Sequence, residues 1–199
     1  MRVSLLLLVC PLFSGCLAFV YPSITNTPVI QVEEPDVHAF RVVSGVIQSG
    51  PWMTGPIDFY ETVETLPTKD NAIASQSNTY FPYYYLAFPV AEGAHHRSLE
   101  ILLYRRGYET VSIPAVSWLR FSEHMARPQW KKAEQLEDVE KAIETITPSR
   151  FDLSRGSTEV RQFVAQEYTW LADSEWVTGP ERETVRQCLL EKAKNPESK

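Results

Sequence analysis

The hydrophobic residues of this chain recur with a period of two up to about residue 122, and with helical spacing after it. Leu99, Ile101 and Leu103 alternate along one segment, and the segment 37–47 is rich in Val, Phe and Ile. A period of two places every second side chain on one face of a β-strand. Pro and Gly separate such segments, as is typical of an antiparallel β-sandwich. The other segments expected to form strands are 57–63, 80–90 and 108–113.

From residue 123 onward, apolar residues recur every three or four positions, which puts them on one face of a helix. The first expected helix begins near Pro128 and ends at Pro148. A second takes Ser157 as its N-cap, and a third follows a capping-box pattern from Thr178 to Glu181. Each helix has one apolar stripe, so each must pack on another element. The expected fold is therefore α+β: an antiparallel β-sandwich followed by a helical tail of about three helices.

The amino terminus has the pattern of an export signal. Arg2 precedes the apolar run Val3 to Phe13, and the small residues Ser14 and Gly15 precede Cys16. The sequence Phe-Ser-Gly-Cys resembles the lipobox of bacterial lipoproteins, although that family prefers Leu where Phe13 stands. The resemblance implies a lipid on the thiol of Cys16 and cleavage of the bond before it. The protein's expected partner is then a membrane, reached through that lipid.

Three other interpretations of this segment stay open. A plain signal peptide would be cut after Ala18, and Cys16 would be an ordinary buried thiol if it carried no lipid. An uncleaved helix from Val3 to Val20 would have to span a membrane, which takes about 20 apolar residues without such breaks as Pro11. In lipoproteins of bacteria with two membranes, a residue other than Asp after the cysteine implies the outer membrane, and Leu17 stands there.

The expected boundaries are 1–15 for the signal peptide, 16–122 for the β-sandwich domain and 123–199 for the helical C-terminal region. The chain has 199 residues and a formal net charge of −6, with no basic run. Nucleic-acid binding requires Lys and Arg to neutralise phosphates, so no nucleic-acid partner is expected. Cys10 would be removed with the signal peptide and Cys16 would carry lipid, so Cys188 is left without a partner. No disulfide is therefore expected, and the core must hold the fold.

His95 and His96, with Glu92 nearby, are weak candidates for a metal site. Adjacent residues of an extended segment point to opposite faces, so the two imidazoles do not easily reach one ion. An envelope hydrolase or metal-dependent enzyme would need His38 or His124 to converge on them. The sequence contains no HExxH, CxxC or EF-hand spacing, no GxSxG and no Gly-rich phosphate loop. We therefore predict no enzymatic activity and no cofactor.

The aromatic residues of the segment 80–90 are a candidate platform for stacking on sugars. Tyr80, Tyr83 and Tyr85 would form it, with Trp52 from the preceding Gly-Pro-Trp-Met-Thr-Gly loop as an accessory. A glycan-binding module is thus one alternative function. The other interpretation is structural, because alternation along a strand already explains these residues as one buried and one half-exposed face. The remaining tryptophans are expected to join the sheet to the tail: Trp118, Trp130, Trp170 and Trp176.

The segment from Leu102 to Ile113 resembles the closing hairpin of carboxypeptidase-regulatory-like, or transthyretin-like, domains. In such a hairpin Gly107 takes a positive φ at the turn and Tyr108 covers the edge of the sandwich. The whole layout, including Tyr21-Pro22 and the stretch 36–42, is similar to a group of uncharacterised bacterial lipoproteins, which implies no activity. We therefore expect a lipid-anchored, non-catalytic envelope protein with a structural role or a binding site for another envelope protein.

Overall fold

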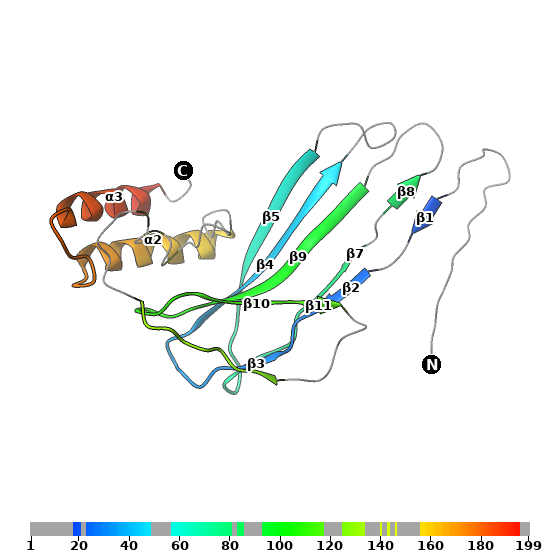
Figure 1. Ribbon diagram of the computed structural model, residues 1–199, viewed down its shortest axis with the longest axis horizontal. Helices are drawn as coiled ribbons and strands as arrows, with labels where there is room; N and C mark the ends of the chain where they lie inside the picture. The colour runs from blue at the N-terminus through cyan, green and yellow to red at the C-terminus, as the bar shows by residue number, and fades with distance from the viewer. Residues whose placement is uncertain are drawn as a thin grey trace.

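The protein is represented by a computed structural model, which describes residues 18–20, 23–48, 57–80, 83–85, 93–117, 125–133, 140, 143, 146 and 156–195. These residues form a mixed α+β molecule. Two helices, a central sheet and an outer pair of strand segments follow one another in layers along its longest axis (Figure 1). The α+β class expected from the sequence is confirmed.

A four-stranded antiparallel sheet with the strand order β10-β9-β4-β5 forms the middle layer. Its inner strands are β4 (His38–Gln48) and β9 (Gly93–Tyr104), and its edges are β5 (Ile57–Leu66) and β10 (Val111–Pro114). The strand expected at 37–47 is thus confirmed as β4. The inner strands supply most of the buried residues of this sheet, because elements pack on both of their faces.

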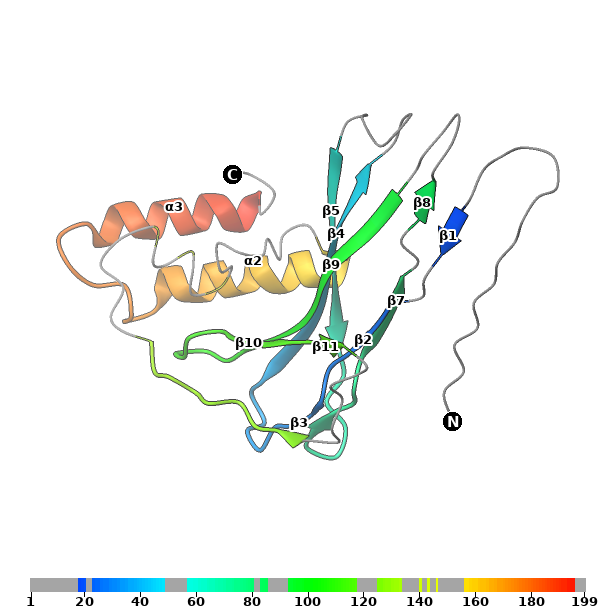
Figure 2. The same cartoon turned by 45° about the vertical axis from the view of Figure 1, so that its right-hand side comes forward.

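The segments 18–31 and 72–85 pair with each other outside the central sheet (Figure 2). Ala18 pairs with Tyr85, and Gln31 pairs with Ala72. The register does not shift between the three paired regions. Moving one residue forward in 18–31 always corresponds to moving one residue back in 72–85. We call this pair the ribbon. Its strands are β1 (Ala18–Val20), β2 (Ser23–Asn26), β3 (Val29–Gln31), β6 (Ala72–Ile73), β7 (Ser77–Tyr80) and β8 (Tyr83–Tyr85).

Two short strands extend the ribbon at its side. β11 (Val116–Ser117) pairs antiparallel with β2, and β12 (Met125–Ala126) pairs parallel with β3. The chain reverses direction just before β6 at Asp70 and Asn71, which have φ of 52° and 57°. Asp and Asn tolerate this left-handed conformation better than most residues.

Alternation along β9 divides the hydrophobic core into two clusters. Leu102 and Tyr104 face the helices and pack with Phe40 and Val164 among others. Ile101 and Leu103 face the ribbon instead. All of these side chains are buried, as expected from the alternation in the sequence. The central sheet therefore holds the helices on one face and the ribbon on the other.

The second expected helix is confirmed as α2 (Thr158–Asp173), and the hydroxyl of its N-cap Ser157 accepts a hydrogen bond from the Val160 amide. The third is confirmed as α3 (Arg182–Lys194), but its predicted capping box is wrong. The helix begins after Glu181, and no side chain caps it. Gly179 has a φ of +88°, so the chain turns there before the helix starts. In the part of the chain described, no helix is long and apolar enough to cross a membrane.

The start predicted for the first helix, near Pro128, is also wrong. Residues 127–133 are not helical, and they run beside the connection between β9 and β10. The Glu109 amide donates to the Lys131 carbonyl at 2.8 Å, and the Ala133 amide donates to the Gly107 carbonyl at 3.0 Å. These tertiary hydrogen bonds outweigh the helical spacing of the apolar residues. Glu140, Ile143 and Ile146 are helical, whereas residues 134–139 lie outside the described residues.

Candidate functional site around the Arg-Gly-Tyr turn

The connection from β9 to β10 contains a turn that only glycine fits well. Gly107 has a φ of +79°, so the positive φ expected at this position is confirmed. A Cβ atom on Gly107 would lie 2.8 Å from Cζ2 of Trp176, closer than van der Waals contact allows. The glycine thus serves both the turn and the close approach of the indole from the helical region.

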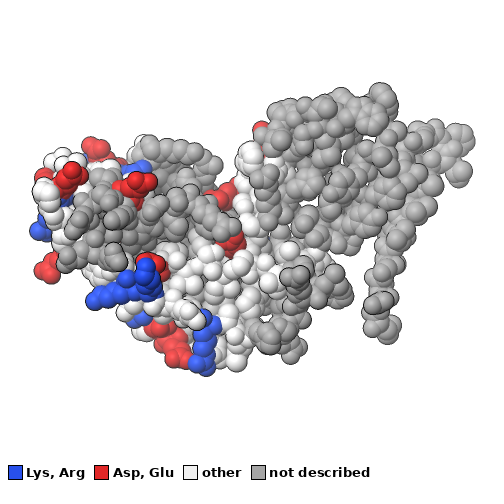
Figure 3. Space-filling model, viewed as in Figure 1, with Lys and Arg blue, Asp and Glu red and all other residues white. Residues whose placement is uncertain are grey.

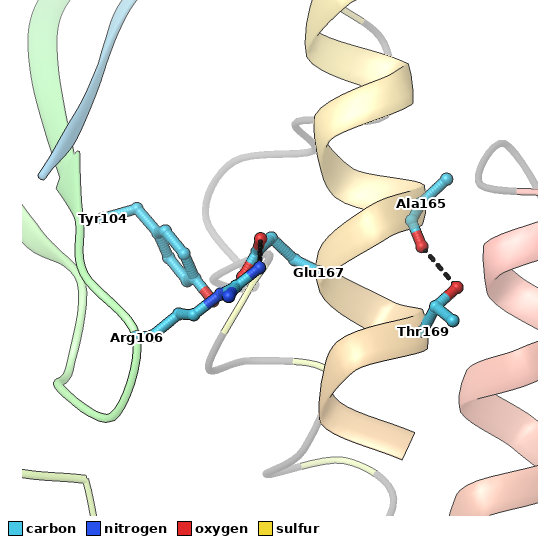
Figure 4. Close-up of polar contacts among 5 residues, drawn as sticks. All are labelled: Tyr104, Arg106, Ala165, Glu167 and Thr169. Atoms are coloured by element: carbon cyan, nitrogen blue, oxygen red, sulfur yellow. Dashed lines mark hydrogen bonds and ion pairs between the residues drawn. The ribbon is translucent and has the colours of Figure 1, made fainter. Parts of the chain in front are cut away.

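Arg106 joins this turn to α2 through a buried carboxylate (Figure 4). Its Nε donates to Oε2 of Glu167 at 2.9 Å, and its Nη2 donates to Oε1 at 2.7 Å. The hydroxyl of Tyr104 also donates to Oε2 of Glu167, at 2.8 Å. Glu167 is 3% exposed. A bidentate Arg–carboxylate pair of this kind is stronger than a neutral hydrogen bond and fixes the geometry of both groups.

The electrostatics of this cluster favour a structural role over acid–base chemistry. Burial raises the pKa of Tyr104, and the charge of Glu167 beside it raises it further. The hydrogen bond to Glu167 likewise raises the pKa of Arg106. A general acid or base works best with a pKa near the ambient pH, and these shifts move both groups away from it. Tyr104 and Arg106 therefore act as fixed donors to Glu167.

Arg105 connects the same turn to the other side of the sheet. Its Nε donates to both carboxylate oxygens of Asp36, at 3.1 and 3.2 Å, and its guanidinium lies 4.4 Å from the ring centroid of Tyr108. Tyr108 in turn contacts Trp130, with 6.0 Å between the ring centroids. The two adjacent arginines of this turn thus bind different layers, Arg105 toward Asp36 and Arg106 toward α2.

A shallow hollow of about 380 Å³ lies next to the turn, lined by Lys132, Ala133, Glu175 and Trp176. Nζ of Lys132 lies 6.0 Å from the ring of Trp176. Lys132 and Glu175 are exposed, and neither forms an ion pair with any residue that the structure describes. The hollow therefore offers an aromatic surface with one charge of each sign at its rim, which suits contact with a polar surface residue of another molecule.

Comparisons with known proteins give no match. No family model, no curated protein and no solved structure matches this chain.

The candidate metal ligands are only partly within the described residues. The backbone of β9 places His95 opposite Val46 and His96 opposite Gly45, whereas His38 pairs with Tyr104 at the other end of β9. The register therefore separates His38 from the two adjacent histidines by most of the strand. Glu92 and His124 lie outside the described residues. Among the described residues, no group of three His, Cys, Asp or Glu side chains is placed to hold a metal ion.

The side chains of the candidate sugar platform also lie outside the described residues. Tyr80 ends β7, and Tyr83 and Tyr85 begin and end β8, but their side chains are not among those described. Trp52 and Cys16 lie outside the described residues as well. The sugar platform and the lipid on Cys16 stay predictions.

Two of the four tail tryptophans join the helical region to the sheet as expected. Trp170 of α2 lies under the guanidinium of Arg106, 4.7 Å from it, and Trp176 packs on Gly107. Trp130 instead belongs to the core between the sheet and the ribbon. Trp118 lies outside the described residues. Trp170 and Trp176 thus both meet the sheet at the Arg-Gly-Tyr turn.

Sequence reasoning missed Glu167, the central acceptor of this site. The signal was present, because Glu167 falls on the same helical face as Val160, Val164 and Leu171. An acidic residue inside an apolar stripe indicates a buried partner, since an unpaired buried charge is strongly unfavourable. The sequence does not indicate a role for Lys132, because the helix predicted from near Pro128 does not place this residue beside the turn at Gly107.

Proposed function

We propose that this protein is a lipid-anchored component of the cell envelope, fixed to a membrane through Cys16. The observation that supports this best is the position of β1, which begins at Ala18, two residues after Cys16. A chain cleaved before Cys16 would begin almost directly with the folded body. Loss of residues 1–15 would then remove the export signal and leave every described strand and helix in place.

The position of β1 also disfavours the other interpretations of the amino terminus. Cleavage after Ala18 would remove the first residue of β1. A membrane-spanning helix from Val3 to Val20 would need Ala18–Val20 in a helix, whereas these residues pair with β8 as a strand. Cleavage before Cys16, as the lipobox resemblance implies, leaves β1 complete and requires no helix at Ala18–Val20. The outer membrane stays the proposed location for a host with two membranes.

We propose a non-catalytic role for the folded body, either structural or in binding another envelope protein. The Arg-Gly-Tyr turn supports this, because its ion pair, aromatic stacking and glycine all serve to hold the layers together. The helices lie at the end of the longest axis opposite β1 (Figure 1). An anchor at Cys16 would therefore present the helices and the hollow beside Trp176 away from the membrane, where a partner protein can reach them.

The finer fold proposal is a transthyretin-like or carboxypeptidase-regulatory-like β-sandwich, with a further helix before α2. The β9–β10 hairpin with its positive φ at Gly107 supports the sandwich type. The helical conformation at Glu140, Ile143 and Ile146 supports the further helix. The alternative functions, a hydrolase using His95 and His96 or a glycan-binding module, gain no support from the described geometry.

Metabolic labelling with an alkyne-bearing palmitate tests the anchor. The full chain, expressed in a bacterial host, should carry the label, and Cys16→Ser should lose it, because the thiol is the site of acylation. Cys188→Ser is the matched control and should keep the label, since Cys188 belongs to α3. Label that persists in Cys16→Ser, or no label on the parent chain, would contradict the proposal.

A further inference from the structure

The ribbon and the strand β11 beside it come from three segments that contain no charged residue. These are 17–32, 71–91 and 110–119, in a protein in which 22% of all residues are charged. The segments are far apart in sequence, and the fold brings them side by side. In Figure 3, charged side chains lie over the helices, the nearby turns and β5, while the described surface near β2 and β11 is uncharged.

One face of the ribbon packs on the central sheet, and the other is exposed. Thr27, Ile30 and Ile73 are buried on the inner face. The outer face includes Ile24 and Val116, which are 38% and 40% exposed. Register places Thr79 opposite Ile24, and Asn26 opposite both Ser77 and Val116. Because residues opposite in register share a face, the outer face is defined by Ile24, Asn26, Ser77, Thr79 and Val116.

Charged side chains from other parts of the chain meet the ribbon at β7, where Arg41 donates to the Ser77 carbonyl at 3.4 Å, and at the end far from β1. Glu33, just beyond β3, forms an exposed ion pair with Arg127 at 3.8 Å. Lys69 and Asp70 are exposed just before β6. The outer-face residues of β2, β7 and β11 are uncharged in the described part of the ribbon, which leads toward β1, the strand that follows Cys16.

We propose that the outer face of the ribbon lies against the headgroup region of the membrane to which Cys16 is anchored. This inference rests on the proposed function and names a second membrane contact beyond the lipid. Transfer of Asp, Glu, Lys or Arg toward a bilayer is costly, whereas Tyr and other amphipathic rings are enriched at its interface. The ribbon segments contain no Asp, Glu, Lys or Arg, and their sequence includes Tyr80 and Tyr83 to Tyr85.

A lipid surface fits this face better than a protein surface does. Protein interfaces usually carry Arg and a polar, charged rim that gives specificity, and the ribbon segments supply no charge of either sign. The anchor also holds β1 at the bilayer, so contact by the ribbon costs little further entropy. With no Lys or Arg in the ribbon, the contact depends on apolar burial, and it should resist salt.

Quenching by lipid-bound nitroxide tests this contact in the intact chain. In a Cys188→Ser background, Ile24→Cys and Val116→Cys each carry a fluorophore, and the protein is reconstituted into neutral phosphatidylcholine vesicles with a nitroxide near the headgroup. Both positions should lose most of their emission relative to vesicles without nitroxide, and salt at about 1 M should not restore it. Phe59→Cys on β5, where the side chain is 69% exposed, is the control and should keep its emission. Circular dichroism of each labelled variant verifies the fold.

These experiments distinguish a failure of the ribbon contact from a failure of the lipid anchor. Equal emission with and without nitroxide at positions 24 and 116 would overturn the ribbon contact, and palmitate on Cys16 would then leave the anchor standing. Equal quenching at positions 24, 116 and 59 would also overturn it, because the contact would not be specific to this face. Quenching at 24 and 116 in a chain without palmitate would support the ribbon contact and overturn the anchor.

Discussion

Glu167 is an acidic residue on the buried face of α2, and it is accommodated by three donors. Arg106 supplies two hydrogen bonds and Tyr104 the third. Burial of a charge is costly, so a pair like this one adds less stability than its geometry suggests. Its larger effect is on specificity, because the carboxylate fixes which turn of α2 faces the β9–β10 connection.

Removal of the carboxylate should destabilise the fold measurably. Glu167→Ala leaves the Tyr104 hydroxyl buried without an acceptor, so we expect the free energy of unfolding to fall by about 1–3 kcal/mol. The loss on the Arg106 side is smaller, because that side chain is 49% exposed and water replaces the partner. Urea titration measures the change. Glu64→Ala, which breaks the exposed pair with Arg41, should cost only about 0–1 kcal/mol. Equal losses in both variants would contradict this account.

The same cluster should make stability depend on alkaline pH. Burial raises the pKa of Tyr104 above its ordinary value of 10.0. In the unfolded chain this phenol ionises near that value, while in the folded chain it stays protonated. Its stabilisation is therefore complete below about pH 10 and is lost as pH rises further. Between about pH 9 and 11, the melting temperature of the parent should fall more steeply than that of Tyr104→Phe. Parallel curves would exclude Tyr104 as the source.

The two described helices of the tail begin in different ways, although the sequence offers an N-cap pattern for each. Ser157 caps α2 through its hydroxyl, and its own amide donates to the Val63 carbonyl of β5. Thr178 lies before the positive φ of Gly179 and does not cap α3. A cap pattern acts only if the backbone before the helix is extended, and the turn at Gly179 removes that condition.

This difference predicts unequal effects for two similar substitutions. Ser157→Ala removes the capping hydroxyl and should lower the free energy of unfolding by about 1 kcal/mol. Thr178→Ala removes a hydroxyl of the same kind that caps nothing, and should leave the stability nearly unchanged. Thermal unfolding followed by circular dichroism compares them. A loss of stability in Thr178→Ala as large as that in Ser157→Ala would indicate that the Thr178 hydroxyl does cap α3, contrary to the structure.

The arrangement of layers gives the molecule two different outer sides. The central sheet is buried on both faces, with one hydrophobic cluster toward the helices and one toward the ribbon. The helical side carries many charged residues (Figure 3), and the two ribbon segments contain none in their sequence. An anchored protein with this asymmetry would rest on its uncharged side and expose its charged side to solvent. The order of the layers thus bears on how the anchored molecule is oriented, whereas the anchor itself rests on Cys16.

Local pattern was sufficient for the strands of the central sheet and for two of the helices, but the ribbon strands within 18–31 and 72–79 were not predicted. Alternation located β4 and the buried residues of β9, and helical spacing with Ser157 located α2. The positive φ of Gly107 was predicted from the hairpin resemblance and is confirmed. These features depend on neighbours within one turn or one strand, so the sequence of a short segment contains the information that determines them.

Other features depended on contacts between distant segments. Residues 127–133 have helical spacing but pair with the turn around Gly107, because hydrogen bonds and aromatic contacts there outweigh a weak local preference. The position of Glu167 on the apolar face of α2 indicates a buried partner, but only the fold shows that the partners are Tyr104 and Arg106. The uncharged face of the ribbon combines three segments far apart in sequence. The sequence alone therefore determined the strands of the central sheet and the helices α2 and α3, whereas long-range pairing decided the ribbon and which surfaces the elements build together.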